Sequence, residues 1–370
     1  MAAWCAVLVL ARVYLAATLD LFGDEAFYRW ESRNLAWSYS DLPPLTALLM
    51  ALGRTLFGES DLALRSAFLV SGLTLPVAVY WLARPYGSPA GALSSALLAL
   101  LLPATATLGI LAVPDALLLT VCTLFLGSVE RAVRLDSVHW WLVAGCCACI
   151  GFLTHYRFVF LPAALGLAFL CYPVLRRHLW TVGPWLALLI GALGMLPALW
   201  FNFGNDFEAL GFHFARRHPW SFHGEGLRYP LQQAAAASPL LYVFLLLSLL
   251  ASLRLSLRGD AGQALLSAVS LFYFLGLSLL APWVDQTSTT IHWAWFGYIP
   301  MLVVLPPMLV QWWQSGGWRR WLGVAALGLG GVSVAASLAM MLAPLHYDAL
   351  PPSLRPRVSI KMAGWDALRA

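Results

Sequence analysis

The residues of this sequence that could do chemistry are few, and they gather where long apolar runs end. Asp24 and Glu25 follow the first apolar run, Asp115 opens a later one, and His155 and Arg157 separate two others. A carboxylate in such a place can act as general base on a hydroxyl. Arginine and histidine can hold a phosphate and stabilise the charge of a leaving group. These residue types predict a site for group transfer from a lipid-phosphate carrier.

Further polar residues stand at the corresponding ends of other runs. They are Tyr28, Asp41, Tyr156, Asn202, Arg216, Arg217 and His292. Ionisable groups at membrane depth are costly, and they are more often functional than decorative. We therefore treat all of them as candidate site residues.

Structural roles compete with these functional ones. The acids at positions 24, 25 and 115 are also typical of helix N-termini, and Asp41 also suits a turn. His155 and Arg157 are also typical of interfacial anchors, and His292 of an aromatic belt. The arginines at positions 216 and 217 also fit a solvated loop.

The composition identifies a membrane protein. The chain has 370 residues, of which 61% are hydrophobic and 11% are charged, and its mean hydropathy is +0.77. A soluble core of this size needs a charged shell that this sequence lacks. The net charge of +5 comes from arginines scattered over short loops, so no nucleic-acid partner is expected.

The apolar runs predict about eleven transmembrane helices, since one span needs about 20 apolar residues. The runs lie near 3–21, 63–83, 89–108, 112–130, 138–155, 157–175, 181–201, 235–253, 262–283, 292–313 and 320–343. The first run lacks a basic leader and a cleavage site, so it is expected to be an uncleaved span. Residues 1–343 are expected to form one transmembrane domain, and 344–370 a short outer tail without a domain.

Arginines set the expected orientation. Alternate short loops carry Arg84, Arg131, Arg134, Arg176, Arg177, Arg254, Arg258, Arg319 and Arg320. Such loops face the cytoplasm by the positive-inside rule. The candidate site then faces the outside of a bacterial cytoplasmic membrane.

Two outer loops, about 22–62 and 202–234, are long, and long loops often carry function. In the first, Phe27, Trp30 and Trp37 alternate with charged residues near helical spacing. This pattern predicts an amphipathic helix in the membrane interface. The shorter run 43–57 is expected to be interfacial or re-entrant. The six cysteines all lie in apolar runs and are expected to be packing residues.

Several short motifs resemble those of one enzyme family. The chain resembles bacterial polyprenyl-phosphate-sugar-dependent glycosyltransferases of the GT-C fold, which are related to protein O-mannosyltransferases and lipid A aminoarabinose transferases. The likeness covers roughly residues 15–300. Its motifs are Gly-Asp-Glu-Ala-Phe-Tyr at 23–28, Asp-Leu-Pro-Pro-Leu at 41–45, Leu-Phe-Gly at 56–58, Arg65, Pro-Asp-Ala-Leu at 114–117, Thr-His-Tyr at 154–156, Trp-Phe-Asn at 200–202, Phe-His-Phe at 212–214, Arg216 and His-Trp-Ala at 292–294.

The resemblance implies an all-α polytopic fold, namely a GT-C bundle with amphipathic helices in the first outer loop. It implies sugar transfer from a polyprenyl-phosphate donor to a lipid, glycan or protein acceptor at the outer face. Asp24 would be the catalytic carboxylate and Asp115 the second active-site acid. Asp41 would lie beside the donor phosphate, and Arg65 would support the first loop.

Two departures from the family pattern concern phosphate binding. Relatives often carry lysine or histidine just before Pro-Pro, where this chain has Leu42, and His155 stands where many carry lysine. Arg157, Arg216 or Arg217 would then take over the phosphate.

Two other functions remain as alternatives. A lipid-linked sugar transporter would place ionisable groups near the midplane, whereas here they stand at the outer ends. A non-catalytic assembly subunit is favoured by the missing lysine and disfavoured by the two retained acids. No cofactor is required, although the paired acids are also compatible with a divalent cation. Membrane lipids are the remaining expected partners.

Overall fold

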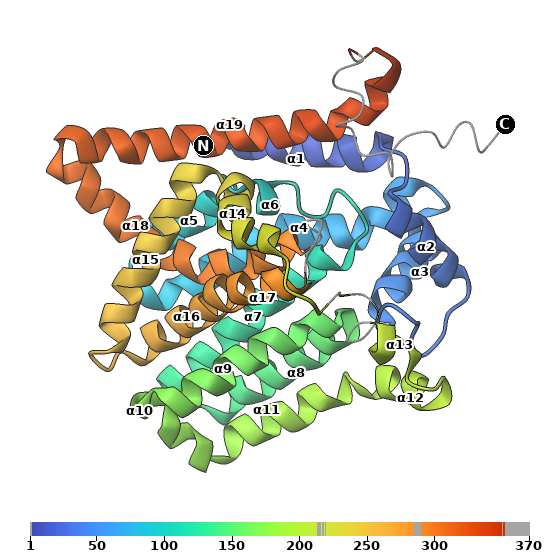
Figure 1. The fold of residues 1–370 in the computed structure, drawn as a ribbon, viewed down its shortest axis with the longest axis horizontal. Coiled ribbons are helices and arrows are strands. Elements are labelled where there is room, and N and C mark those ends of the chain that lie inside the picture. The colour runs from blue at the N-terminus through green and yellow to red at the C-terminus, as the bar shows by residue number, and fades with distance from the viewer. Residues whose placement is uncertain are drawn as a thin grey trace.

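The structure is a computed structural model, in which residues 2–212, 216, 218, 220–284, 290–349 and 351 are described. Every regular element in these residues is a helix (Figure 1). The all-α fold predicted from the sequence is confirmed.

The longest apolar helices cross most of the bundle. They are α4 (Asp61–Ala83) with η1 (Arg84–Tyr86), α7 (Pro114–Leu135), α15 (Pro239–Ser256), α16 (Ala261–Leu271) with the π-helix η6 (Phe272–Gly276) and α17 (Leu277–Val284), η7 (Ile291–Ala294) with α18 (Trp295–Ser315), and α19 (Gly317–Leu342) with η8 (Ala343–Ala349).

Three further helices bend sharply into a second segment. Helix α1 (Ala2–Thr18) bends by 68° into α2 (Gly23–Arg33). Helix α9 (Phe160–Cys171), preceded by η2 (Tyr156–Val159), bends by 103° into α10 (Pro173–Arg176) and η3 (Arg177–Trp180). Helix α11 (Val182–Leu193) bends by 46° into α12 (Leu196–Gly204).

The remaining helices are shorter. They are α3 (Leu45–Phe57), α5 (Pro89–Ala99), α6 (Pro103–Ala106), α8 (Val138–Thr154), α13 (Glu208–Gly211), η5 (Gly224–Arg228) and α14 (Tyr229–Ala237).

Each of the eleven predicted apolar runs coincides with a helix, but the count of eleven spans is not confirmed. Within the described residues, six helices are long and apolar enough to cross a membrane, or nine if each bent pair is one span. Helices α5 and α8 fall short of that length. Composition marks apolar runs, whereas the proline or turn that breaks a helix decides its length. The chain is a multi-pass membrane protein.

The two ends of the bundle differ in content. Figure 1 shows α2, α3, α12 and α13 gathered at one end, on the right of the view. The α15–α16 turn, the α18–α19 turn and the α10 segment lie at the opposite end. These three regions carry Arg254, Arg258, Arg319, Arg320, Arg176 and Arg177. We call the two ends the cavity end and the arginine end.

Helix α2 is amphipathic, with five charged residues among eleven. Glu25, Tyr28 and Glu31 are buried against the protein, while Phe27 and Trp30 are exposed. An aromatic outer face on a charged helix suits the membrane interface. Helix α2 therefore lies outside the membrane-spanning segments, as predicted for the first loop.

The segment between α5 and α7 packs closely on α4 because two glycines permit it. A Cβ at Gly72 would stand 2.1 Å from the carbonyl oxygen of Leu108, and Gly109 has a φ of +87°. Only glycine tolerates both conditions at little cost. Buried Arg12 donates hydrogen bonds to the carbonyls of Gly72, Thr105 and Ala106. These contacts fix the chain that leads into Asp115.

Candidate active site

A polar cavity of about 730 Å³ lies at the cavity end. Seven predicted site residues line it together with the apolar segment 104–113, Phe22, Trp295 and Met341. Those seven are Asp24, Tyr28, Asp41, Asp115, His155, Arg157 and His292. Residues from seven regions of the sequence, Phe212 among them, thus meet around one space, with carboxylates, cations and apolar walls.

One face of α2 supplies the acids of the first loop. Asp24, Tyr28 and Glu31 are spaced i, i+4 and i+7, so their side chains share one side of the helix. Asp24 is exposed at the cavity, whereas Tyr28 is buried. Burial and the nearby carboxylates, Asp41 first, raise the pKa of Tyr28 well above its usual value. Tyr28 is therefore a neutral hydrogen-bonding group in this site.

The neighbouring Glu25 points away from the cavity into a buried ion pair with Arg65. Arg65 Nε and Nη2 each lie 2.8 Å from a different carboxylate oxygen of Glu25. The remaining Arg65 donors reach the carbonyls of Ala16, Leu19 and Asp20. Both side chains are 0% exposed.

Glu25 also joins the first loop to the start of α7. Its carboxylate accepts hydrogen bonds from the backbone N–H of Phe22 at 2.8 Å and of Ala112 at 2.6 Å. Asp115 follows Ala112 by three residues. The Glu25–Arg65 pair therefore holds Asp24 and Asp115 at one cavity, and neither Glu25 nor Arg65 lines it.

Asp115 pairs with Arg157 inside the cavity. Arg157 Nη2 lies 2.9 Å from Asp115 Oδ1, and the two side chains are 10% and 14% exposed. The guanidinium carbon also lies 5.9 Å from the centre of the Trp293 ring. Nη1 of Arg157 has no hydrogen-bond partner in the described part of the chain. Arg157 can therefore donate to an anion in the cavity.

His155 holds the same guanidinium from the other side. Its Nε2 lies 3.1 Å from Arg157 Nε, and its Nδ1 lies 3.0 Å from the backbone N–H of Arg157. An imidazolium accepts no hydrogen bond, and a neutral imidazole accepts at one nitrogen. His155 can therefore accept only one of these two hydrogen bonds, and in either case its ring lies against Arg157.

A second feature of the first loop is a pair of neighbouring carboxyl groups, those of Glu31 and Asp41. Glu31 is 1% exposed, and its carboxyl group lies against that of Asp41. Burial, followed by the charge of Asp41, raises the pKa of Glu31 to about 9. Burial also raises the pKa of Asp41. Glu31 is therefore protonated at neutral pH and lies beside Asp41.

Three predicted residues lie outside the cavity lining. The Tyr156 hydroxyl lies next to Ser38 and Asn202. Buried Asn202 donates to the carbonyl of Ala198 and accepts from the backbone N–H of Leu210. Exposed Arg216 donates to the carbonyl of Glu208. These contacts organise the second long loop; Arg217 and the Phe-His-Phe motif beyond Phe212 lie outside the described residues.

The sequence reasoning missed Glu31 and the apolar wall. Glu31 stands seven residues after Asp24, about two helical turns, and this spacing could have predicted that both lie on one face of the helix. No sequence pattern distinguishes segment 104–113, Trp295 and Met341, because apolar residues are common in every membrane helix. No three His, Cys, Asp or Glu side chains among the described residues are grouped as metal ligands.

Part of the chain is similar to a known protein family. Residues 41–201 match the family described as dolichyl-phosphate-mannose-protein mannosyltransferase. This stretch begins at Asp41 and includes Asp115, His155 and Arg157. A search of curated proteins by sequence found no match.

Solved structures share the fold over almost the whole chain. ArnT from Cupriavidus metallidurans in the apo state is 18% identical with a TM-score of 0.69, over 96% of this chain and 67% of ArnT. The same protein bound to undecaprenyl phosphate is 16% identical with a TM-score of 0.67, over 96% and 66%.

A second group of similar structures comes from an archaeon. AglB, the oligosaccharyltransferase of Archaeoglobus fulgidus, was solved with an inhibitory peptide and a dolichol-phosphate. It is 12% identical with a TM-score of 0.61, over 97% of this chain and 59% of AglB. The chain therefore spans about two thirds of ArnT and less of AglB. It is a membrane protein that shares the GT-C fold of these structures, and its residues 41–201 are similar to the mannosyltransferase family named above.

Proposed function

We propose that the chain transfers a sugar from a polyprenyl-phosphate donor to a lipid, glycan or protein acceptor of the cell envelope. One observation carries this proposal: Asp24 and the Asp115–Arg157 pair line a single cavity that also has apolar walls. The similar structures that hold undecaprenyl phosphate and dolichol-phosphate support a carrier of this class. Residues 1–343 would act as one transferase domain.

The donor phosphate binds at Arg157 in this proposal. Among the described residues that line the cavity, Arg157 is the only arginine or lysine. Its Nη1 supplies charged donors at a partly buried site, where they are strong. Leu42 adds no charge where relatives often carry a cation, and the Glu31–Asp41 pair would repel an anion more than attract it.

Asp24 acts on the acceptor. Its exposed carboxylate takes the proton of an acceptor hydroxyl, whose oxygen attacks the anomeric carbon of the sugar. The bond from that carbon to the phosphate oxygen breaks, and its electron pair stays on the polyprenyl phosphate beside Arg157. Attack opposite the leaving phosphate inverts the anomeric carbon. An acceptor that is itself an ionised phosphate would need Asp24 only for positioning.

The carrier chain enters from the bilayer past Phe22, Leu111 and Met341, which form apolar parts of the cavity wall. We place the cavity outside the bacterial cytoplasmic membrane. The arginine-rich turns at the far end of the bundle support this orientation.

The decisive experiment compares envelope lipids, glycans and proteins from a deletion strain with those of the strain expressing the wild-type chain. Mass spectrometry should show one glycoconjugate that loses a sugar on deletion. Asp24→Asn, folded and inserted in the membrane, should not restore it, since a general base contributes about 10²–10⁴ in rate. Asp206→Asn, an exposed acid outside the cavity, is the control. Full restoration by Asp24→Asn would refute the mechanism.

Two further observations separate the alternatives. Purified chain in vesicles should make a new glycosidic bond, whereas a transporter would move the lipid-linked sugar unchanged. Because the proposal assigns the phosphate charge to Arg157, transfer should continue after treatment with EDTA. Loss of transfer that is restored by Mg²⁺ would instead assign a cation to the two acids.

A further inference from the structure

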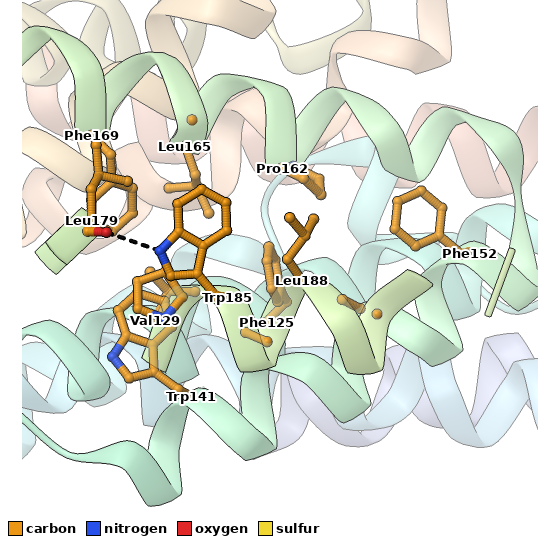
Figure 2. A pocket seen from close by; sticks show the side chains of 15 residues that line it. Phe125, Val129, Trp141, Phe152, Pro162, Leu165, Phe169, Leu179, Trp185 and Leu188 are labelled. Atoms are coloured by element: carbon orange, nitrogen blue, oxygen red, sulfur yellow. Dashed lines mark hydrogen bonds between the residues drawn. The ribbon is translucent and has the colours of Figure 1, made fainter. Parts of the chain in front are cut away.

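A second cavity, of about 200 Å³, lies away from the candidate active site, among α7, α8, α9 and α11. Its lining is almost wholly apolar, with Phe125, Phe152, Gly166 and Leu188 along its length. Figure 2 shows Trp141 and Trp185 near Leu179 at one end and Phe152 at the other. The Trp185 indole N–H is satisfied by the carbonyl of Leu179 at 2.9 Å. The Trp185 indole N–H is therefore already used within the protein.

The cavity opens sideways onto the lipid-facing surface. Trp185 and Leu188 are 57% and 59% exposed, and Gly166, which also lines the cavity, is exposed as well. An engineered apolar cavity of about 150 Å³ is large enough for benzene. A stretch of several carbons of one hydrocarbon chain therefore fits here.

A cationic surface lies at the Trp185 end of this cavity. Segment α10–η3 turns by 103° from α9, so it runs across the ends of the helices. It carries Arg176 and Arg177 and no acid, and Trp180 is 89% exposed. Exposed tryptophan next to arginine is typical of the headgroup region of a bilayer.

The two guanidinium groups retain capacity for a ligand. Arg176 uses Nε and Nη2 on the carbonyl of Leu170, and Arg177 uses Nε on His178. Nη1 of Arg176 and both terminal nitrogens of Arg177 have no partner among the described residues. The neighbouring acid Asp136 lies 3.8 Å from His178 Nδ1, and no ion pair joins it to either arginine among the described residues.

We propose that this region binds one anionic phospholipid from the leaflet at the arginine end. One acyl chain occupies the apolar cavity, and the phosphate lies on Arg176 and Arg177. Basic pockets beside transmembrane helices bind acidic headgroups in this way. The lipid would join α9 and α11, and it is independent of the transfer reaction at the cavity end.

Filling the apolar cavity tests whether an acyl chain binds there. A Cβ at Gly166 meets no atom within 4 Å, so Gly166→Leu should insert its side chain without a clash. Displacing about two methylenes weakens binding about tenfold. The purified chain should retain phosphatidylglycerol by native mass spectrometry, and Gly166→Leu should lose at least that factor. Gly328→Leu, exposed on α19 and equally free of contacts, is the matched control.

Neutralising the arginines tests the headgroup site. Wild type should gain more thermal stability from phosphatidylglycerol than from phosphatidylcholine, and the double variant Arg176→Gln/Arg177→Gln should lose that difference. Arg258→Gln, exposed in another turn of the arginine end, should keep it. Equal stabilisation of wild type by both lipids, unchanged retention in Gly166→Leu, or recovery of a polyprenyl phosphate in place of phospholipid would each overturn the proposal.

Discussion

The cavity end contains two arginine–carboxylate pairs. They differ in how many N–H donors of the arginine lack a hydrogen-bond partner among the described residues. Arg65 gives all five of its N–H donors to Glu25 and to three backbone carbonyls. Arg157 gives Nε to His155 and Nη2 to Asp115, and it keeps Nη1. The first pair is fully buried and the second lines the cavity.

This difference indicates a structural role for the first pair and a substrate-binding role for the second. A saturated ion pair can only hold its neighbours in place, because any new ligand would displace an existing bond. A pair with spare donors beside open space can bind a substrate anion. The contrast predicts that Arg65 variants lose stability, whereas Arg157 variants lose transfer.

Arg65→Gln should have the largest effect, on stability. It leaves the Glu25 carboxylate buried without its cation, which costs about 3–5 kcal/mol. Thermal unfolding in detergent should show a large loss for Arg65→Gln and a much smaller one for Arg157→Gln. Equal losses in the two variants would remove the distinction between the pairs.

Arg157→Gln should have the next largest effect, on the rate of transfer. Loss of one donor to a developing charge costs about 10²–10³ in rate. Arg157→Lys should recover only part, because lysine cannot pair with Asp115 and reach a phosphate in the same planar geometry. The rate is measured on membranes with equal amounts of folded chain. An Arg157→Gln chain with the wild-type rate would show that the phosphate binds elsewhere.

His155 should have a smaller effect, because it acts through Arg157. His155→Leu removes one hydrogen bond to a charged group, worth about 1.5 kcal/mol, which is about tenfold in rate. His155→Gln should restore most of the rate, since its side-chain oxygen can accept from Nε. His139→Leu, exposed on α8, is the control. A loss in His155→Gln as large as in His155→Leu would point to direct substrate contact instead.

The Glu31–Asp41 pair should give an effect of another kind, a dependence of stability on pH. The pKa of Glu31 lies near 9 in the folded chain and near 4.3 when unfolded. The folded state therefore binds the extra proton between these values, and stability falls as pH rises through them.

The slope should not exceed about 1.4 kcal/mol per pH unit for one proton. Glu31→Gln keeps a hydrogen-bond donor to Asp41 and should remove this part of the slope. Glu225→Gln, an exposed side chain at η5, should leave it. Melting temperatures from pH 5 to 9 measure both, and a wild-type profile that rises over this range would contradict a protonated Glu31.

The sequence predicted the helices and the cavity acids for a physical reason. A membrane span must be a long apolar run, so the rare charges between runs are visible. The sequence could not predict which of these acidic side chains points into the protein. Asp24 and Glu25 are adjacent, about 100° apart around a helix, and only the position of Arg65, 40 residues away, decides which one turns inward.

The second long loop was harder to predict. Asn202 and Arg216 looked like ligand contacts because polar residues there are few, yet both bond to the backbone of their own loop. Loop hydrogen bonds depend on turns that carry no periodic signal. The prediction of Asp24 and Asp115 as catalytic residues remains to be tested by the variants above.

The hydrogen bonds of buried Arg12 predict how position 12 should vary among homologous sequences. All three of its acceptors are main-chain oxygens, so no second side chain has to change with it. Among homologues, position 12 should keep arginine without a covarying partner, while positions 25 and 65 should change together or not at all.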